Sequence, residues 1–246
     1  AAFVGAVGQD DDGNSLVQLL QEVGVDVRGV QKHPTAPTRL IYVLRSETGD
    51  RQFAGFGQRQ SDEFADTHLL ADKIPQKLFE EADFLVMGTL ELAYPDTREA
   101  IARALELAEE NKVKILLDVN WRPVFWEDEA QAKELIENIL QKVDFVKLSE
   151  EEAEWLFETT DPKHIGRRLE VAQGILVTAG DEGCFYYLGE TKGRLPAFSV
   201  EAVDTTTAGD VFNGALAVAL SEGRAMPEAI QFAHAAAALS VRRMGA

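Results

Sequence analysis

From about residue 82 onward, short apolar runs alternate with helical segments, and this alternation restricts the fold more than any other feature. The apolar runs cover residues 84–88, 115–119, 145–148 and 175–178. After the first run, residues 96–111 place apolar side chains at the i, i+3, i+4, i+7 spacing of a helix, and a second helix is expected over 128–141. Non-alternating strands separated by helices are typical of a parallel sheet that is buried on both faces. We therefore predict an α/β fold, a central mostly parallel sheet with helices on both faces.

Polar side chains follow these runs at the points where the strands should end. In such sheets, ligands bind in the crevice at the carboxyl ends of the strands. We therefore expect a binding edge there, formed by Asp118, Lys147, Ser149 and Thr178.

The region from about residue 26 to 62 has a different pattern. Residues 39–45 and 51–56 are strand-like and flank the turn residues 47–50, which predicts a hairpin. We interpret the chain as a single α/β domain, residues 1–246, with a small β-lid insertion at about 26–62. A decorative edge hairpin is the alternative to a lid.

Charge and composition exclude some functions. The net charge of −18 over 246 residues argues against a nucleic-acid partner, because such a surface repels phosphate backbones. No segment is long and apolar enough to predict a membrane partner. The single cysteine, Cys184, lies in an apolar run and fits a reducing compartment, so a cytoplasmic location is expected. Both ends look cut, which leaves an organellar stroma as the alternative.

The segment 204–210, Asp-Thr-Thr-Thr-Ala-Gly-Asp, opens an almost wholly apolar helix. A helix N-terminus offers free N–H groups and the positive end of the dipole, so it can bind an anion. Asp210 at this terminus can cap the helix. It can also take a proton from an attacking hydroxyl while the N–H groups hold a phosphate.

Four segments together resemble the ribokinase-like (PfkB) carbohydrate kinases, in the family's order. Residues 203–216 are similar to the C-terminal Asp-Thr-x-Gly-Ala-Gly-Asp signature, and residues 3–13 to the early Gly-x-x-Gly-x-Asp-x-x-Gly segment. Residues 147–152 resemble the Asn-x-x-Glu motif, and residues 231–240 the final helix beside the adenine pocket. Thr207 stands where the family usually has glycine, and Ser149 where it usually has asparagine.

The resemblance implies a transfer of the γ-phosphate of ATP to a sugar hydroxyl, with Mg²⁺. Asp210 would be the general base, and the N–H groups of Thr207, Ala208, Gly209 and Asp210 would hold the transferring group. Glu152 would act on Mg²⁺ through water. The residues implied on the ATP side are Lys147, Ser149, Thr178, Gly180, Gly183, Gly209 and His234. Asp204 and Thr206, with Gly245, resemble part of a monovalent-cation loop, which implies K⁺.

The segment Asp118-x-Asn120-x-Arg122-x-x-x-Trp126 resembles one found in fructokinases and 2-keto-3-deoxygluconate kinases. It implies that Asp118 and Asn120 hydrogen-bond sugar hydroxyls and that Arg122 binds a phosphate or a carboxylate. By the same resemblance, Glu91 is a further sugar contact. Glu91 could instead be an exposed loop acid, Glu152 a solvated charge in the acidic run 150–154, and Arg122 a structural arginine paired with an acid.

The resulting prediction is a fructokinase-like enzyme that makes fructose 6-phosphate. Ribose is the second candidate substrate and 2-keto-3-deoxygluconate the third. A catalytically silent binding or scaffold subunit is the alternative of a different class, and Thr207 favours it. The expected partners are ATP and a small sugar, and a homodimer through the β lid is a further expectation.

Overall fold

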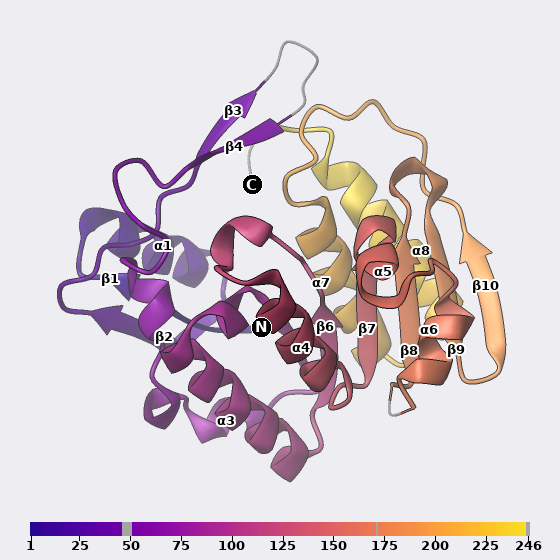
Figure 1. Ribbon diagram of the computed structural model, residues 1–246, viewed down its shortest axis with the longest axis horizontal. Coiled ribbons are helices and arrows are strands. Elements are labelled where there is room, and N and C mark those ends of the chain that lie inside the picture. Colours follow the sequence, from indigo (N-terminus) through magenta and orange to yellow (C-terminus); the bar gives the residue numbers. More distant parts are fainter. Residues whose placement is uncertain (46–50, 171, 245–246) are drawn as a thin grey trace. The chain divides into compact units, whose positions relative to one another are not determined.

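The computed structural model describes residues 1–45, 51–170 and 172–244, which form two compact units (Figure 1). The first unit comprises residues 1–82 and 91–112, and the second comprises residues 83–90 and 113–246. Each unit is described by itself below. The single domain over residues 1–246 stays a prediction.

The second unit is built on a six-stranded sheet in the order β10-β9-β8-β7-β6-β5. Its strands are β5 (Phe84–Met87), β6 (Lys114–Asp118), β7 (Phe145–Ser149), β8 (Gly174–Thr178), β9 (Cys184–Leu188) and β10 (Thr191–Leu195). Strands β5 to β8 pair in parallel, and β9 and β10 are antiparallel additions at one edge. The four predicted apolar runs are the four parallel strands, which confirms the mostly parallel α/β sheet.

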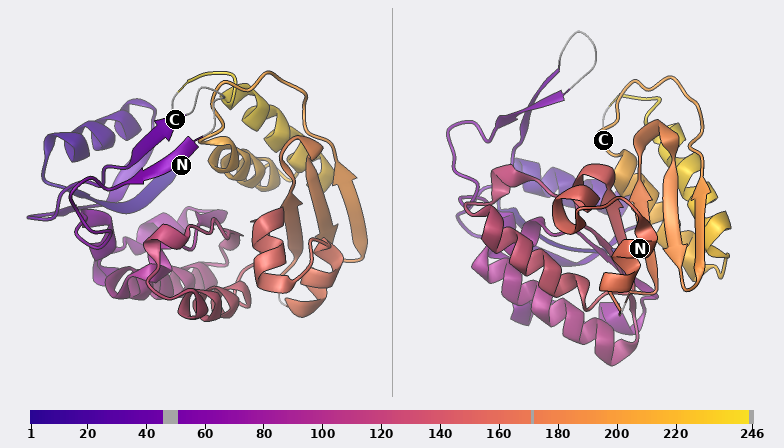
Figure 2. Two further views of the ribbon diagram at one scale, coloured as in Figure 1. Left: turned by 45° about the horizontal axis from the view of Figure 1, so that its top comes forward. Right: turned by 45° about the vertical axis from the view of Figure 1, so that its right-hand side comes forward.

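Helices cover both faces of this sheet, as predicted (Figure 2). They are α4 (Glu129–Leu140), α5 (Glu150–Phe157), α6 (Pro162–Arg168), α7 (Ala208–Ser221) and α8 (Met226–Ser240). Helices α7 and α8 pack on the sheet face that carries Leu116 and Leu176, and both leucines are fully buried. Because strand side chains alternate between faces, the equally buried Leu117 and Val177 point to the opposite face, where α5 and α6 pack.

The strand register brings the expected polar residues together at one edge. Asp118 at the end of β6 lies opposite Lys147 of β7, and Ser149 at the end of β7 lies opposite Thr178 of β8. Neighbouring strands are about 4.8 Å apart, so these side chains lie within reach of one another. The alignment of the apolar runs therefore sets the geometry of the candidate site.

The first unit contains a parallel pair, β1 (Ala2–Gly8) and β2 (Asp26–His33), joined by α1 (Asp11–Glu22). Its other elements are α2 (Gln76–Glu80), α3 (Pro95–Asn111) and short 3₁₀ turns at Ala65–His68 and Ala71–Lys73. A further 3₁₀ turn, Leu90–Ala93, begins at the last residue of a second-unit segment and continues into the first unit. Among the described residues of the whole chain, no helix is both long and apolar enough to cross a bilayer.

The predicted hairpin forms as the antiparallel pair β3 (Tyr42–Arg45) and β4 (Arg51–Gly55). Its expected turn, residues 47–50, lies outside the described residues. The antiparallel pair spans fewer residues than the predicted insertion at 26–62, because residues 26–33 pair in parallel with β1 instead. At its base, Arg39 donates to Asp66 and to the carbonyl of Ser61, and its guanidinium lies over the ring of Phe64. Its role as a lid stays a prediction.

Asp10 links α1 to the segment that follows β2. Its Oδ1 accepts from Gly13 N at 2.8 Å and from Thr38 Oγ1 at 2.6 Å, and its Oδ2 accepts from Thr38 N at 2.7 Å. The hydrogen bond from the Thr38 hydroxyl is the largest of the causes that lower the pKa of Asp10. A Cβ at Gly8 would lie 2.5 Å from this carboxylate, so the glycine allows the close approach.

We expect Asp10→Ala to lower the free energy of unfolding by about 1–2 kcal/mol, because the helix loses its N-cap. Since the pKa of Asp10 is lower in the folded chain, its contribution is full above the unfolded-state pKa. The contribution is lost as the pH falls through the folded-state pKa. Urea denaturation at pH 7 and pH 3 measures this. An equal cost of Asp10→Ala at both pH values would contradict the prediction.

Candidate functional site

Helix α7 begins without a side-chain cap. Thr207 is its N-cap residue, with φ −103° and ψ 9°, and its hydroxyl makes no capping bond. Because its φ is negative, this position does not require glycine, and a threonine fits without strain. Within the described part of the chain, the N–H groups of Gly209 and Asp210 have no acceptor. These two N–H groups and the helix dipole leave the terminus open to an anion.

Asp210 is the third residue of α7, so it is not the N-cap. Its side chain is exposed, and among the described residues it makes no hydrogen bond or ion pair. Partial desolvation raises the pKa of Asp210, and the charge of Asp118 raises it further. The charges of Lys147 and Arg122 oppose this rise. A carboxylate that is solvent-accessible, free of partners and shifted toward neutral pH suits a general base.

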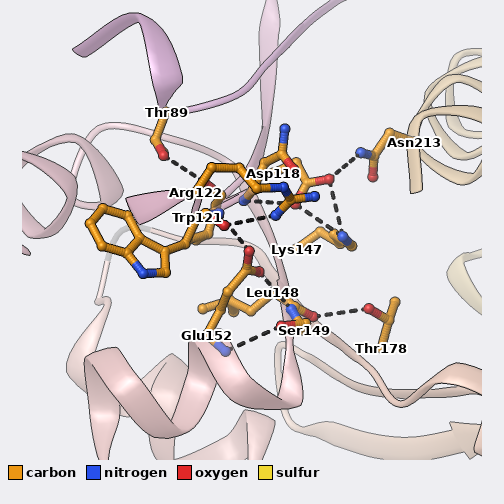
Figure 3. Close-up of polar contacts among 12 residues, drawn as sticks. Thr89, Asp118, Trp121, Arg122, Lys147, Leu148, Ser149, Glu152, Thr178 and Asn213 are labelled. Atoms are coloured by element: carbon orange, nitrogen blue, oxygen red, sulfur yellow. Dashed lines mark hydrogen bonds and ion pairs between the residues drawn. The ribbon is translucent and has the colours of Figure 1, made fainter. Parts of the chain in front are cut away.

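Asp118 is the centre of a buried polar cluster (Figure 3). Lys147 Nζ donates to both carboxylate oxygens at 3.0 Å, and Asn213 Nδ2 donates to Oδ2 at 2.7 Å. Asn120 N donates to Oδ1 at 3.2 Å. The side chains of Asp118, Lys147 and Asn213 are buried, with residue exposures of 6%, 8% and 4%. These contacts occupy the acceptor positions that a sugar hydroxyl would need, so the geometry favours a structural role for Asp118 over the expected sugar contact.

Glu152 connects two strand ends. Its Oε2 accepts from Ser149 N at 2.8 Å and Ser149 Oγ accepts from Glu152 N, which forms the capping box of α5. Its Oε1 accepts from Trp121 N at 2.6 Å, in the loop after β6. Burial raises the pKa of Glu152, against the effect of these N–H donors and of Lys147. Ser149 and Glu152, which the sequence predicts to act on ATP and Mg²⁺, therefore also cap the start of α5, and Glu152 holds the loop after β6.

We expect Glu152→Gln to lower the free energy of unfolding by about 1–3 kcal/mol, because the new amide NH₂ must face one of two backbone donors. Urea denaturation followed by tryptophan emission measures the change. The matched control is Glu151→Gln, whose side chain is exposed in the same helix turn. A cost of Glu152→Gln no larger than that of the control would show that the two N–H bonds contribute nothing.

The loop after β6 is held in an unusual conformation. Asn120 has a φ of +44°, in the left-handed region where asparagine is among the better-tolerated residues. The exposed Arg122 donates from Nη1 to the carbonyl of Trp121 at 2.7 Å, which leaves most of its donors facing solvent. The ring of Trp121 stacks on Trp155 at 4.2 Å and lies 5.8 Å from Trp126. Two of the three tryptophans of the chain, Trp121 and Trp126, thus belong to this loop, and the third, Trp155 of α5, packs against it.

The segment 178–183 forms the turn between the antiparallel strands β8 and β9. Gly180 and Gly183 have φ values of +52° and +100°, and a Cβ at Gly183 would lie 2.1 Å from the carbonyl oxygen of Leu195. Thr178 Oγ1 donates to the carbonyl of Leu148 at 3.2 Å. The two glycines are thus required by the turn itself, and their contact with ATP stays a prediction. Cys184 is fully buried, and burial raises its pKa to about 12, which agrees with a packed thiol.

His234 is a packed histidine of α8. It is 7% exposed, and its ring centroid lies 5.4 Å from that of Phe212. Burial lowers its pKa, and a hydrogen bond to the backbone of Pro196 opposes this effect. Its Nδ1 is buried without a partner among the described residues. Its predicted place beside adenine is not decided by these contacts.

Two further predicted sites have mainly local contacts. Asp204 Oδ1 accepts from Thr206 N at 2.9 Å and from Thr206 Oγ1 at 2.7 Å, which closes a local turn. Gly245, predicted to complete a cation loop with them, lies outside the described residues. Glu91 belongs to the first unit, where the residue is surface-accessible but desolvation by the surrounding protein raises the pKa of its carboxyl; its carbonyl accepts from Thr97 Oγ1. Their roles stay predictions.

Sequence reasoning missed Asn213 and Thr89 as parts of this site. Asn213 is the only polar side chain between residues 211 and 220, and that was a signal of a buried partner. Its Oδ1 is also buried without a partner among the described residues. Thr89 is fully buried and donates from Oγ1 to the carbonyl of Val119 at 2.5 Å, which holds the other side of the loop. The sequence around Thr89 carries no comparable signal.

Comparisons with known proteins agree on one family. The model of the pfkB family of carbohydrate kinases matches residues 1–246. Fructokinase-1 of Zea mays is 35% identical over 100% of this chain and 78% of its own length. A fructokinase from Xylella fastidiosa, solved with ATP, superposes with a TM-score of 0.88 at 26% identity, covering 100% of this chain and 80% of its own. An E. coli protein assigned as ribokinase II, solved with ATP and Mg²⁺, gives a TM-score of 0.88 at 27% identity, covering 99% and 77%.

Proposed function

Because the chain belongs to the pfkB family of carbohydrate kinases, we propose that this sugar kinase acts on fructose and produces fructose 6-phosphate. The similarity to fructokinases at 35% identity supports the choice of fructose. The segment from Asp118 to Trp126 and the serine at position 149 support it from the residues. Ribose and 2-keto-3-deoxygluconate are the alternatives that the experiment below includes.

The observation that carries the proposal is the open N-terminus of α7, where the N–H groups of Gly209 and Asp210 have no acceptor among the residues that the structure describes. Asp210 takes the proton of the primary sugar hydroxyl as its oxygen forms a bond to the γ-phosphorus. The bond from that phosphorus to the β–γ bridging oxygen breaks, and ADP leaves. The N–H groups of Gly209 and Asp210 hold the charge on the transferring group, and the chain contributes mainly position and electrostatics.

ATP with Mg²⁺ is the phosphoryl donor in this proposal, and the E. coli structure that holds this pair supports the assignment. Mg²⁺ neutralises phosphate charge when bound. Both oxygens of Glu152 already accept a backbone N–H, so contact through water fits this carboxylate better than direct coordination. The exposed fork of Arg122 is free to bind a phosphate or the sugar side. A requirement for K⁺ at Asp204 and Thr206 remains a proposal.

An assay of ADP release with fructose, ribose and 2-keto-3-deoxygluconate tests the proposal. We expect the highest kcat/KM with fructose, and ADP release by the Asp210→Asn variant about 10²–10⁴-fold slower than by wild type. A preference for ribose or for 2-keto-3-deoxygluconate would overturn the substrate assignment but leave the sugar kinase in place. ADP release by Asp210→Asn at the wild-type rate would overturn the role of Asp210.

A cytoplasmic location and a homodimer through the β3–β4 lid are also proposed, on the sequence alone. Size-exclusion chromatography with light scattering measures the second. A monomer at every concentration would remove the dimer from the proposal.

A further inference from the structure

A buried polar cluster lies directly under the first turn of α7, and the reaction described above does not use it. It consists of Asp118 of β6, Lys147 of β7 and Asn213 of α7 (Figure 3). Lys147 Nζ and Asp118 form an ion pair at 3.0 Å with side-chain exposures of 11% and 9%. Asn213 Nδ2 joins the helix to this pair at 2.7 Å.

The same pair also faces the helix backbone. A Cβ built on Gly209 would lie 3.7 Å from Lys147 Nζ and 3.9 Å from Asp118 Oδ2, in ordinary contact distance. Gly209 therefore rests on the ion pair, one turn before Asn213. Since Asn213 follows Asp210 by three residues, both side chains share one face of the helix. The cluster thus contacts α7 at two points that bracket Asp210.

A buried ion pair is a poor means of gaining stability, since well-packed apolar residues of similar volume often serve as well or better. The surrounding positions are apolar, with Leu116, Leu176 and Leu216 fully buried nearby in the same core. A directional hydrogen bond fixes an orientation that apolar packing leaves less defined. This suggests a function that depends on how α7 is placed.

We propose that Asp118, Lys147 and Asn213 form a positioning network that holds the first turn of α7, and with it Asp210, against the ends of β6 and β7. This inference rests on the proposed function only in that Asp210 is the base. None of the three residues touches the reacting atoms in the proposal. They act through the helix and through the field that they place on Asp210.

The charges of the network have opposite effects on Asp210. The charged groups that act on it electrostatically are Asp118 of β6, Lys147 of β7 and Arg122 of the loop after β6. Removing the negative charge at 118 makes Asp210 easier to ionise, and removing the positive charge at 147 makes it harder. Asp118→Asn can keep the hydrogen bond between residues 118 and 213, because the Asn213 amide can turn its Oδ1, which has no partner among the described residues, toward the new NH₂. Lys147 Nζ then keeps one of its two acceptors on residue 118.

The test compares Asp118→Asn and Lys147→Met in the pH dependence of kcat/KM with fructose. We expect the acid limb to move by about one pH unit, downward in Asp118→Asn and upward in Lys147→Met. Simple damage to the fold would not produce shifts of opposite sign. The matched controls are Asp144→Asn and Lys114→Met, which break an ion pair of 3.0 Å at the other end of the same sheet and should move nothing.

A second readout needs no sugar. Carbon-13 NMR titration of the Asp210 carboxyl, assigned as the resonance missing from Asp210→Asn, should show the same two shifts. If fructose is not phosphorylated but the NMR shifts appear, the substrate proposal fails and the network stands. Shifts of the same sign, or no shift in either variant, overturn the network.

Asn213→Leu removes the hydrogen bond between α7 and Asp118 without changing a charge. It tests the positioning role if Asp118→Asn or Lys147→Met does not fold. We expect kcat to fall by about 10²-fold, with KM values within a few-fold of wild type, because the base is displaced and the binding groups remain. Asn213→Ser, which keeps a donor, should recover part of the loss. A wild-type kcat in Asn213→Leu, or its failure to fold, would overturn the positioning role.

Discussion

Replacing Asp210 by asparagine is expected to lower kcat by about 10²–10⁴-fold, with KM values for fructose and ATP near those of wild type. The amide has almost the shape of the carboxylate but cannot take the proton of the sugar hydroxyl. The N–H groups of α7 remain in place, so binding should persist. Steady-state ADP release and the binding of ATP, followed by tryptophan emission, measure the two effects separately.

The matched control is Glu228→Gln. Glu228 lies in the first turn of α8, at the same third helical position that Asp210 has in α7. Both changes remove one negative charge from a helix N-terminus, which costs roughly 0.3–1 kcal/mol of stability. Only Asp210→Asn should lower kcat. A kcat above one tenth of the wild-type value would contradict the general-base role, and an equal loss in both variants would point to helix destabilisation.

The same carboxyl should set the acid limb of the pH profile. Asp210 must be ionised to act as a base, so activity falls as the pH falls through its pKa. Because desolvation and Asp118 raise that pKa above the ordinary value of 3.8, the loss on acidification should begin at a higher pH than for a solvated aspartate. The acid limb should be absent from the residual activity of Asp210→Asn.

The strands of the second unit and their carboxyl ends could be predicted from the sequence, because the spacing of apolar residues determines them. Strands buried on both faces must be continuously apolar, so the runs before Asp118, Ser149 and Thr178 located both the strands and their carboxyl ends. The expected helix over 128–141 formed as Glu129–Leu140, with Asp128 as its N-cap. These features depend on local patterns, and a single sequence contains them.

The partners of the site residues could not be predicted in the same way. The bond from Asn213 to Asp118 joins residues 95 positions apart, and it exists only because α7 packs across the end of β6. Likewise Glu152 could be read as a solvated acid in an acidic run, but the fold turns it inward onto Trp121 N. The pattern of residues 26–33 does not show which strand they pair with, so the sequence alone predicts them as part of the lid insertion, whereas they pair in parallel with β1.

Replacing Asp118 by alanine is expected to lower the free energy of unfolding by about 3–5 kcal/mol, because the ammonium of Lys147 would stay buried without its counter-charge. Lys147 is only 8% exposed, and within the described part of the chain both hydrogen bonds of its Nζ go to Asp118. Asn213 Nδ2 would lose its acceptor as well. Urea denaturation at pH 7, followed by tryptophan emission, measures the loss.

The double variant Asp118→Ala, Lys147→Met separates the unpaired charge from the lost packing. Because no charge is then left buried, we expect it to recover a large part of the stability that Asp118→Ala loses. Glu106→Ala is the surface control: its partner Arg103 is 36% exposed, so water replaces the carboxylate and the cost should stay below about 1 kcal/mol. If the double variant were no more stable than Asp118→Ala, the cost would come from the cavity and not from the charge.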